Sequence, residues 1–432
     1  MNVCVVGLGK IGLPFAVQVA TSGNHVFGVD ISQDVVDLVN NGFPPFPGEP
    51  LLDEKLRVAI NNNSLEATTD ISSAVANSKA VIVLVPLITD EFSEPDFKSI
   101  DEVTESIGAS LTKGTLVSYE TTLPVGTTRN RFAVKLSELS GCILGRDLFV
   151  VYSPERVFSG RVFKDLRSYP KLVGGVNEES TDKGVHFYES ILEFDRRPEL
   201  PVPNGVWAME SSEAAELAKL AETTYRNVNI GLANEFAEFA EDQGIDIYEV
   251  IRASNSQPFS HIHQPGIAVG GHCIPVYPRF YLSNDPNARI PAAAIEVNEL
   301  TPFKKIEKIV ERLGSIKGLK AVVLGASYRG GVKETAFSGV FGVSQALEKF
   351  GAKVQIHDPF FTDSEISSLG FSPYHFGQKC EIAVLQADHA EYLSLKASDM
   401  PGIQIVFDGR NFLDPDNWEN VVFLQIGKNI KK

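Results

Sequence analysis

Val3-Cys4-Val5-Val6-Gly7-Leu8-Gly9-Lys10-Ile11-Gly12 is the stretch that decides the fold of this chain. Its β-branched run predicts a buried strand, and the glycines follow at the G-x-G-x-x-G spacing that joins such a strand to a helix. The first glycine makes the turn, the second admits a pyrophosphate, and the third lets helix and strand pack closely. Free N–H groups at the start of the helix favour an anion. The stretch therefore predicts a dinucleotide site.

Asp30 ends the next predicted strand, 18 residues after Gly12. A carboxylate at this place accepts hydrogen bonds from the ribose hydroxyls of adenosine and repels a 2′-phosphate, so NAD is expected rather than NADP. A glycine-rich turn that binds no ligand is the alternative. The residues expected to bind the cofactor are Gly7, Gly9, Lys10, Ile11, Gly12 and Asp30.

The pattern around this stretch predicts an α/β fold. Short apolar runs separated by helical segments indicate a parallel sheet buried on both faces; the predicted strands are Val3–Val6, His25–Val29, Ala80–Val85, Thr115–Ser118 and Leu148–Tyr152. A second α/β block begins near Leu319, with predicted strands Lys320–Gly325 and Lys353–Pro359. Because this block lacks the full G-x-G-x-x-G spacing, it need not hold a dinucleotide.

We therefore expect two Rossmann-like doubly wound domains joined by a central helical domain. The predicted boundaries are 1–190 for the NAD-binding domain, 200–300 for the central domain and 301–432 for the last domain. Three domains also suit a chain of 432 residues.

Composition excludes several classes of protein. With 39 basic and 55 acidic residues the formal net charge is -16, which argues against nucleic acid and anionic lipid as partners. No secretory signal and no apolar run of about 18 residues is present, so no membrane span is expected. The four cysteines are scattered, without metal-ligand spacing. They predict neither zinc nor disulfides and fit a reducing cytoplasm.

A long helix is predicted from about Glu210 to Gln243. At about 100° per residue, one face is apolar; it carries Leu217, Ala221, Tyr225, Val228, Leu232, Phe236 and Phe239. The opposite face is polar and carries Lys219, Thr223, Asn227 and Asn234. Two interpretations of this polar face are open, a solvated surface and a face that meets a ligand.

The segment Gly270-Gly271-His272-Cys273-Ile274-Pro275 displays a thiol. Paired glycines let the backbone approach a ligand, and the proline stiffens the exit from the turn. Cys273 is either a nucleophile or a buried small hydrophobe.

Two further segments follow predicted strands, at the sheet edge where ligands bind in such folds. Thr122, in Tyr119–Thr127, either bonds a cofactor ribose or a water or forms a turn. Glu155, in Ser153-Pro154-Glu155-Arg156, is either a base or a cap of the next helix.

Taken together, the chain resembles the UDP-glucose/GDP-mannose dehydrogenase family over essentially its whole length. The most specific segments are Ser153–Val157, Ala218–Glu222, Val228–Glu235 and Gly270–Pro275. The GGHCIP form is most similar to the branch that acts on UDP-N-acetylmannosamine or UDP-N-acetylglucosamine.

The resemblance implies a four-electron oxidation of C6 of a nucleotide sugar to a uronic acid, with two NAD+ used in turn and a thioester on Cys273. It implies an oxyanion-stabilising role for Lys219 and roles in handling water and protons for Thr122 and Glu155. Further cofactor contacts are implied for Pro86, Thr122 and Lys333. Substrate contacts are implied for Glu155, Arg156, Lys219, Asn234, Gly270, Gly271, Tyr328 and Arg329.

Three segments of the chain depart from the family pattern. Tyr277 replaces an aspartate four residues past the cysteine, and Thr223 replaces an asparagine four residues past the lysine. An arginine-glutamate-serine run is here Lys333-Glu334-Thr335. The resemblance implies that Tyr277 and Thr223 lie at catalytic positions, and the loss of a carboxylate near the thiol is expected to change the water that is hydrogen-bonded there.

The expected function is thus a cytoplasmic, homodimeric dehydrogenase that makes a uronic acid for polysaccharide synthesis. Alternatives are oxidation of UDP-glucose or a dTDP-hexose, and an oxidation that stops at the aldehyde. A third alternative, from another class, is an NAD-binding regulator with impaired catalysis.

Overall fold

The computed structural model describes residues 1–428, which form two compact units. Unit 1 comprises Met1–Ala221 together with Arg279–Asn284. Unit 2 comprises Glu222–Pro278 and the chain from Asp285 onward. Each unit is built around its own sheet, as the predicted α/β fold with two Rossmann-like domains requires.

Unit 1 holds an eight-stranded sheet in the order β10-β9-β8-β7-β4-β1-β2-β3. The strands are β1 (Asn2–Val6), β2 (His25–Val29), β3 (Leu65–Thr68), β4 (Ala80–Val83), β7 (Thr115–Tyr119), β8 (Leu148–Tyr152), β9 (Lys171–Gly175) and β10 (Val206–Ala208). The strands from β3 to β8 are parallel, whereas β8 and β9 pair antiparallel. A hairpin of β5 (Ile88–Thr89) and β6 (Pro95–Asp96) lies outside this sheet.

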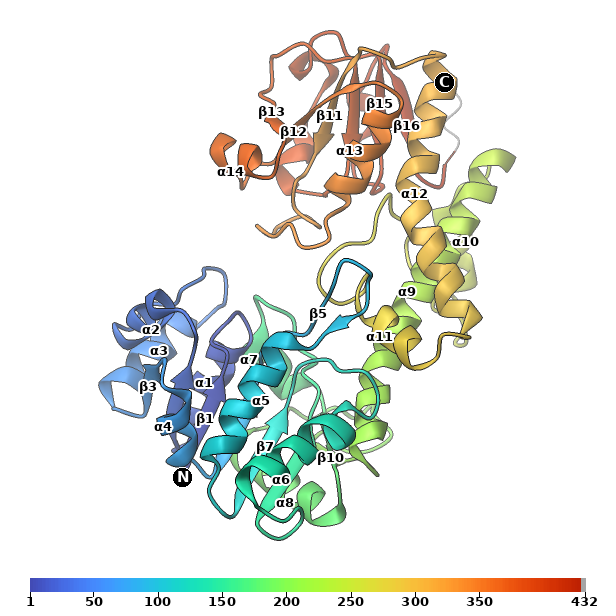
Figure 1. Cartoon of the computed structure of the whole chain (residues 1–432). Helices are drawn as coiled ribbons and strands as arrows, with labels where there is room; N and C mark the ends of the chain where they lie inside the picture. The colour runs from blue at the N-terminus through green and yellow to red at the C-terminus, as the bar shows by residue number, and fades with distance from the viewer. Residues whose placement is uncertain (429–432) are drawn as a thin grey trace. The chain divides into compact units, whose positions relative to one another are not determined.

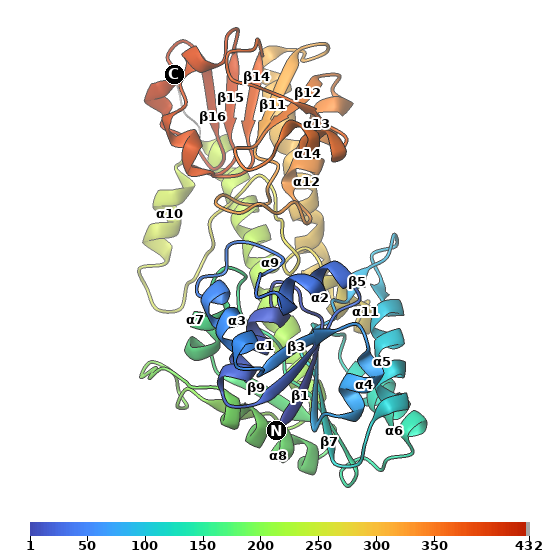
Figure 2. The ribbon, with the colours of Figure 1, turned by 90° about the vertical axis from the view of Figure 1, so that its left-hand side faces the viewer.

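Helices cover both faces of this sheet, as expected for a doubly wound fold. Figure 2 shows α1 (Gly12–Thr21), α3 (Leu52–Asn61) and α7 (Val162–Ser168) on one side. On the other side lie α4 (Ile71–Ala76), α5 (Lys98–Ser110) and α6 (Val134–Ser140). The remaining helical segments are α2 (Gln33–Asn40), the π-helical turn Thr128–Ala133 and α8 (Glu178–Ile191).

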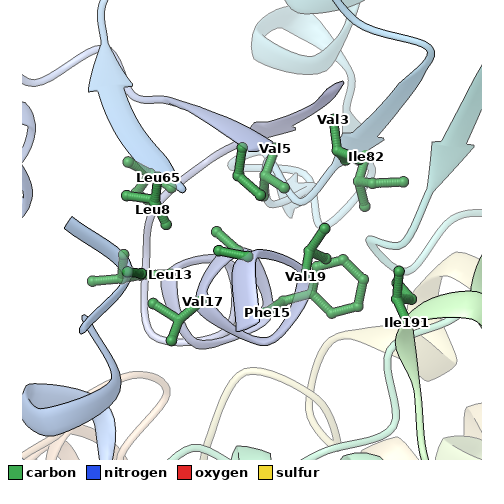
Figure 3. Packing of buried hydrophobic residues seen from close by; sticks show 14 of the residues in the cluster. Val3, Val5, Leu8, Leu13, Phe15, Val17, Val19, Leu65, Ile82 and Ile191 are labelled. Carbon is green, nitrogen blue, oxygen red and sulfur yellow. The ribbon is translucent and has the colours of Figure 1, made fainter. Parts of the chain in front are cut away.

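The apolar run that opens the chain forms the centre of the unit 1 core. Val3 and Val5 of β1 are fully buried, as are Leu13 and Val17 of α1. Figure 3 shows these side chains meeting between strand and helix. Burying such aliphatic side chains contributes about 1.5–3 kcal/mol each. The close contact of β1 and α1 therefore anchors the glycine turn that joins them.

Unit 2 holds a six-stranded parallel sheet in the order β13-β12-β11-β14-β15-β16. Figure 2 shows β16, β15, β14, β11 and β12 side by side. The strands are β11 (Lys320–Leu324), β12 (Lys353–His357), β13 (Ser372–Pro373), β14 (Ile382–Leu385), β15 (Ile405–Asp408) and β16 (Val422–Gln425). Its helices are α10 (Ile247–Ser254), α12 (Arg289–Leu313), α13 (Gly339–Lys349) and α14 (Asp363–Ser368), with 3-10 turns at Ala390–Ser394, Ala397–Asp399 and Pro415–Asn417.

Two helices run through the boundary between the units in the sequence, α9 (Ser212–Gln243) and α11 (Tyr277–Asn284). Figure 1 labels both. Helix α9 is the predicted long helix, and its two faces are the reverse of a typical surface helix. The polar residues Lys219, Thr223, Asn227 and Asn234 are buried, whereas Leu217, Tyr225, Leu232, Phe236 and Phe239 are exposed.

The interpretation of the polar face as a solvated surface was therefore wrong. Its side chains turn inward, and Lys219, Asn227 and Asn234 donate hydrogen bonds within the protein, which partly compensate their burial. No helix among residues 1–428 is both long enough and apolar enough to cross a membrane.

Candidate functional site

The residues predicted for function fall in both units. Unit 1 carries the glycine turn, Thr122, Glu155 and Lys219. Unit 2 carries Thr223 and the Cys273 turn, together with the loop that follows β11.

The three glycines of the first turn meet different surroundings. Gly7 has φ +95°, a backbone conformation that favours glycine. A Cβ on Gly12 would lie 1.8 Å from the carbonyl oxygen of Gly7, so α1 can approach β1 only without a side chain there. A Cβ on Gly9, by contrast, would have no protein atom within 4 Å. The open space lies over Gly9, just before α1 begins.

Asp30 lies directly after β2 and is half-exposed. Its Oδ2 accepts the N–H of Leu8 at 2.9 Å, and its Oδ1 accepts the N–H of Ser32 at 3.0 Å. Both oxygens have further lone pairs, so the carboxylate can still accept from ribose hydroxyls. Open space over Gly9, a helix N-terminus and this carboxylate fit the pyrophosphate and adenosine ribose of NAD.

Other residues predicted for the cofactor also lie near strand ends of unit 1. Lys10 is exposed and Ile11 half-buried within the glycine turn. Pro86 is exposed, three residues after β4, and Thr122 is buried, three residues after β7. The carboxyl ends of neighbouring parallel strands meet at one sheet edge, so these positions lie where the fold binds ligands.

Glu155 follows β8 and uses its carboxylate within the protein. Oε1 accepts the N–H groups of Arg156 at 2.7 Å and Val157 at 3.3 Å, and Oε2 accepts from Lys171 Nζ at 3.0 Å. The next helix, α7, begins at Val162 with Arg161 at its N-cap. The interpretation of Glu155 as a cap of that helix was wrong, because its carboxylate caps its own turn.

Lys171 also contacts Glu120, so two carboxylates share one ammonium. Lys171 Nζ lies 2.7 Å from Glu120 Oε2, and the OH of Tyr188 donates to Glu120 Oε1 at 2.6 Å. Burial raises the pKa of Glu120 to about 7, against the pull of Lys171. Burial would also raise the pKa of Glu155, but the Lys171 ammonium outweighs it and the net shift is downward.

Lys219 lies on α9 and is 8% exposed. Its Nζ donates to the backbone carbonyl oxygen of Glu155 at 2.7 Å. The structure thus brings together two residues predicted for catalysis, Lys219 and Glu155, although through the backbone of the glutamate.

Cys273 lies half-buried in unit 2 as a free thiol. The turn before it is fixed by the N–H of Gly271, which donates to the carbonyl of Ala336 at 2.9 Å. Gly271 has φ +90°, and a Cβ on Gly270 would lie 2.7 Å from Cβ of Tyr328. Both glycines therefore allow the turn to pack on Tyr328 of the same unit, a reason that the sequence did not reveal.

The residue that replaces the expected aspartate opens α11. The N–H of Tyr277 donates to the carbonyl of Cys273 at 2.9 Å, and its side chain is half-buried. Asn227 of α9 donates to the carbonyl of Ile274 at 3.3 Å. The thiol therefore lies on a turn that α9 and the start of α11 hold.

Asn234 and Thr223 lie on the buried face of α9. The amide of Asn234 donates to Asn298 Oδ1 at 3.0 Å and accepts the N–H of Gly266 at 3.0 Å. Thr223 is 4% exposed. In this structure Asn234 joins α12 and a loop, and its predicted contact with substrate stays a prediction.

The loop after β11 carries the other residues predicted to bind ligands. Arg329 donates from Nε to the OH of Tyr328 at 3.1 Å. Lys333 Nζ lies 2.6 Å from Glu365 Oε1 and 5.2 Å from the centre of the Phe361 ring. The predicted cofactor contact of Lys333 stays a prediction.

Sequence reasoning missed Glu120 and Lys171. A weak signal was present, since Glu120 lies at the end of a predicted strand and Lys171 begins an apolar run. No group of three or more metal-ligating side chains lies together in the described part of the chain.

Three domain models of the UDP-glucose/GDP-mannose dehydrogenase family match the chain: the NAD binding domain at residues 1–192, the central domain at 213–300 and the UDP binding domain at 322–415. The chain belongs to this family. It is an NAD-dependent nucleotide-sugar dehydrogenase by family, and NAD is its cofactor.

Related sequences align with nearly the whole chain. A UDP-N-acetyl-D-mannosamine dehydrogenase of Pyrococcus horikoshii is 32% identical over 96% of this chain and 96% of its own length. One of Methanocaldococcus jannaschii is 32% identical over 99% of this chain and 97% of its own length.

Solved structures agree in fold. The UDP-D-ManNAc dehydrogenase of P. horikoshii aligns with a TM-score of 0.87 and 29% identity, over 99% of this chain and 100% of that one. The UDP-N-acetyl-mannosamine dehydrogenase of Staphylococcus aureus aligns with a TM-score of 0.82 and 28% identity, over 99% of both chains.

Proposed function

We propose that this protein oxidises C6 of UDP-N-acetylmannosamine to the uronic acid, through a covalent intermediate on Cys273. The observation that carries the proposal is similarity over almost the full length to relatives with the UDP-N-acetyl-D-mannosamine dehydrogenase name. The free, half-buried thiol of Cys273 supports the covalent step.

The proposed chemistry has two oxidations, and NAD+ accepts a hydride in each. In the first, the C6 alcohol loses a hydride and a proton and becomes an aldehyde. The Cys273 thiolate then adds to C6, forming a C–S bond and an oxyanion that takes a proton. After the second loss of hydride and proton a thioester remains, and water breaks its C–S bond to release the acid and the thiol. Covalent capture keeps the aldehyde from escaping.

The chain's polar groups have separate roles in this proposal. The Lys219 ammonium stabilises the oxyanions that form at the C6 oxygen. Thr122 is proposed to hold a water, and Arg156 with the loop of Tyr328 and Arg329 is proposed to contact the nucleotide sugar. The half-exposed Asp30 and the open space over Gly9 are proposed to receive the ribose and the pyrophosphate.

The substrate is tested with a panel of nucleotide sugars: UDP-N-acetylmannosamine, UDP-N-acetylglucosamine, UDP-glucose and a dTDP-hexose. NADH absorbance should give the highest kcat/KM with UDP-N-acetylmannosamine. A preference for UDP-glucose or a dTDP-hexose would contradict the proposed sugar. No NADH with any sugar would favour the NAD-binding regulator.

A stop at the aldehyde is the second candidate, favoured by Tyr277 in place of a carboxylate near the thiol. If Tyr277 slows capture of the aldehyde by the thiol, the aldehyde is released, and Tyr277→Asp should raise the NADH formed per sugar from one toward two. A ratio that stays at one in the variant would contradict this role of Tyr277.

We further propose that the protein is a cytoplasmic homodimer. The exposed apolar face of α9 supports self-association, since Tyr225 is 53% and Phe239 64% exposed. Its four cysteines are free thiols, which fits a reducing compartment. Sedimentation should give a dimer that Phe239→Lys dissociates; a monomeric wild type would contradict this state.

A further inference from the structure

The ammonium of Lys171 lies buried among the strand ends of unit 1. Lys171 is not one of the residues predicted for function. The Lys171 side chain is 5% exposed, and its partner carboxylates on Glu120 and Glu155 are 0% and 12% exposed. Buried lysines are rare unless paired. One partner of Lys171 is Glu155, whose backbone carbonyl oxygen accepts a hydrogen bond from Lys219.

Three neighbouring strands bring this cluster together. Glu120 directly follows β7, and its carbonyl accepts the N–H of Glu155, three residues after β8, at 3.1 Å. Lys171 is the first residue of β9, which pairs with β8. The cluster is therefore fixed by the register of the sheet rather than by flexible surface side chains.

Aromatic rings enclose the ammonium. Lys171 Nζ lies 5.0 Å from the centre of the Tyr188 ring and 5.5 Å from that of Phe15. Both rings are fully buried. Water is excluded on this side, so the charge of Lys171 is compensated by the two carboxylates and by the ring faces.

The two carboxylates are not equivalent. Burial raises the pKa of Glu120 to about 7, whereas the pKa of Glu155 is lowered because Lys171 outweighs its burial. The pKa of Lys171 itself is raised, since the two carboxylates outweigh its burial. The charged carboxylate is therefore favoured at Glu155 and disfavoured at Glu120.

Glu155 connects this pair to Lys219. One carboxylate oxygen accepts from Lys171, and the other accepts the N–H groups of Arg156 and Val157. The carbonyl oxygen of the same residue accepts from Lys219 Nζ at 2.7 Å. A glutamate side chain fixed at both oxygens leaves its backbone little freedom to turn its carbonyl away.

We propose that Lys171 is a positioning residue, which holds the turn at Glu155 so that its carbonyl oxygen fixes the Lys219 ammonium. The competing explanation is that Lys171 only stabilises the fold. Buried ion pairs by themselves are weak evidence for either stability or function. The experiment must therefore separate the position of Lys219 from stability.

The test variant is Lys171→Met with Glu120→Gln, which removes the cation together with one of the two carboxylates it pairs with. Relative to wild type, kcat should fall about a hundredfold, the loss expected when a catalytic group moves by about 1 Å. KM for NAD should not change, because the glycine turn and Asp30 are untouched. Acetylation of Lys219 by acetic anhydride, followed by peptide mass spectrometry, should become severalfold faster.

Three further variants serve as controls. Glu120→Gln alone keeps an oxygen acceptor for Lys171 and should keep kcat and Lys219 labelling. Lys171→Arg keeps the cation and should rescue both readouts. Lys305→Met with Glu241→Gln removes a buried lysine–glutamate pair of unit 2, with Nζ 2.9 and 3.0 Å from the carboxylate oxygens. It should lower stability without changing Lys219 labelling.

The proposal is overturned if the test variant folds, binds NAD and keeps wild-type kcat and labelling. If that variant does not fold, Lys171→Gln with Glu120→Gln replaces the ion pair by neutral hydrogen bonds and is judged by the same two readouts. The kinetic readout rests on the proposed function. Labelling of Lys219 does not, so it decides the proposal even if no sugar yields NADH.

Discussion

Strands β1 and β11 both lead into a glycine turn, yet the two turns differ in what lies above them. Gly7 has φ +95° and Gly325 φ +106°, and in each unit the next strand along the chain is followed by an aspartate. In the first turn, Asp30 is half-exposed and Gly9 faces open space. In the second, Asp358 is 4% exposed.

Side chains of unit 2 fill the space over its turn. Asp358 Oδ2 accepts from the N–H groups of Ala326 and Ser327, from Ser327 Oγ and from His389 Nε2. A Cβ on Gly325 would lie 2.4 Å from Cβ of Ala387. The same topology is thus open to a dinucleotide in one unit and closed in the other, so the fold alone does not decide binding.

The largest expected effect is that of Gly12→Ala in the open turn. Its Cβ would meet the backbone of Gly7 at 1.8 Å, and backbone atoms cannot move aside without separating α1 from β1. We expect unfolding free energy to fall by about 4 kcal/mol, measured by urea denaturation. A variant as stable as wild type would show that the close contact of helix and strand is not required.

Asp358→Asn should have the next largest effect, on the closed turn. Both oxygens of Asp358 accept from N–H groups, so in the variant an NH2 group faces donors and the negative charge is lost. We expect the free energy of unfolding to fall by about 3 kcal/mol, measured by urea denaturation at neutral pH. Asp30→Asn is the matched control and should change stability much less, because Asp30 is half-exposed. Equal losses would contradict the contrast between the two turns.

The stability difference between wild type and Asp358→Asn should depend on pH. Burial would raise the pKa of Asp358, but His389 and backbone N–H groups outweigh it, so the pKa is lowered in the folded state. The contribution of the Asp358 carboxylate to folding stability is fully present above the pKa of an unfolded aspartate, about 3.9. This contribution is lost as the pH falls through the pKa of the folded state. The stability difference between wild type and Asp358→Asn should therefore shrink below about pH 4. A difference that grows on acidification would contradict this sign.

Gly9→Ala should separate stability from binding. Its Cβ meets no protein atom within 4 Å, so thermal unfolding should not change. The methyl group would take space proposed for the pyrophosphate, and NAD affinity in calorimetry should fall by about 2 kcal/mol, the scale of an overpacked contact. Unchanged NAD affinity would mean that the dinucleotide does not cross Gly9.

Asp30→Asn should give the smallest effect on binding. The loss of charge-assisted hydrogen bonds to the ribose should weaken the binding of NAD by about 1.5 kcal/mol, and the repulsion of the 2′-phosphate of NADP should decrease. The ratio of NAD to NADP affinity should therefore fall in the variant. A ratio equal to that of wild type would remove Asp30 as the discriminating group.

Much of the fold could be predicted because its signals are local. The apolar runs of β1, β2, β7 and β8 and the glycine spacing lie within a few residues each. Strands β5, β6, β9, β10 and β13 to β16 were not predicted. Strand β3 was missed too, since its residues alternate buried and more exposed positions at the sheet edge. Periodicity grouped the residues of α9 correctly, but it could not tell which face turns inward when the polar face makes hydrogen bonds.

The candidate site was harder to predict because its contacts are remote in sequence. Lys171 pairs with Glu120 and Glu155, which are 51 and 16 residues away. No local pattern separates a buried lysine of this kind from a solvated one. The packing of Gly270 on Tyr328 likewise depends on two loops brought together by unit 2. Motifs predicted which residues carry chemistry, whereas the partners of those residues came only from the structure.

The covalent four-electron mechanism is tested most directly by the number of NADH formed per UDP-N-acetylmannosamine consumed, measured together with the uronic acid. We expect two NADH per sugar for the wild type, and no uronic acid from Cys273→Ser. One NADH per sugar would place the end of the reaction at the aldehyde. Unchanged turnover to the acid in Cys273→Ser would contradict the covalent mechanism.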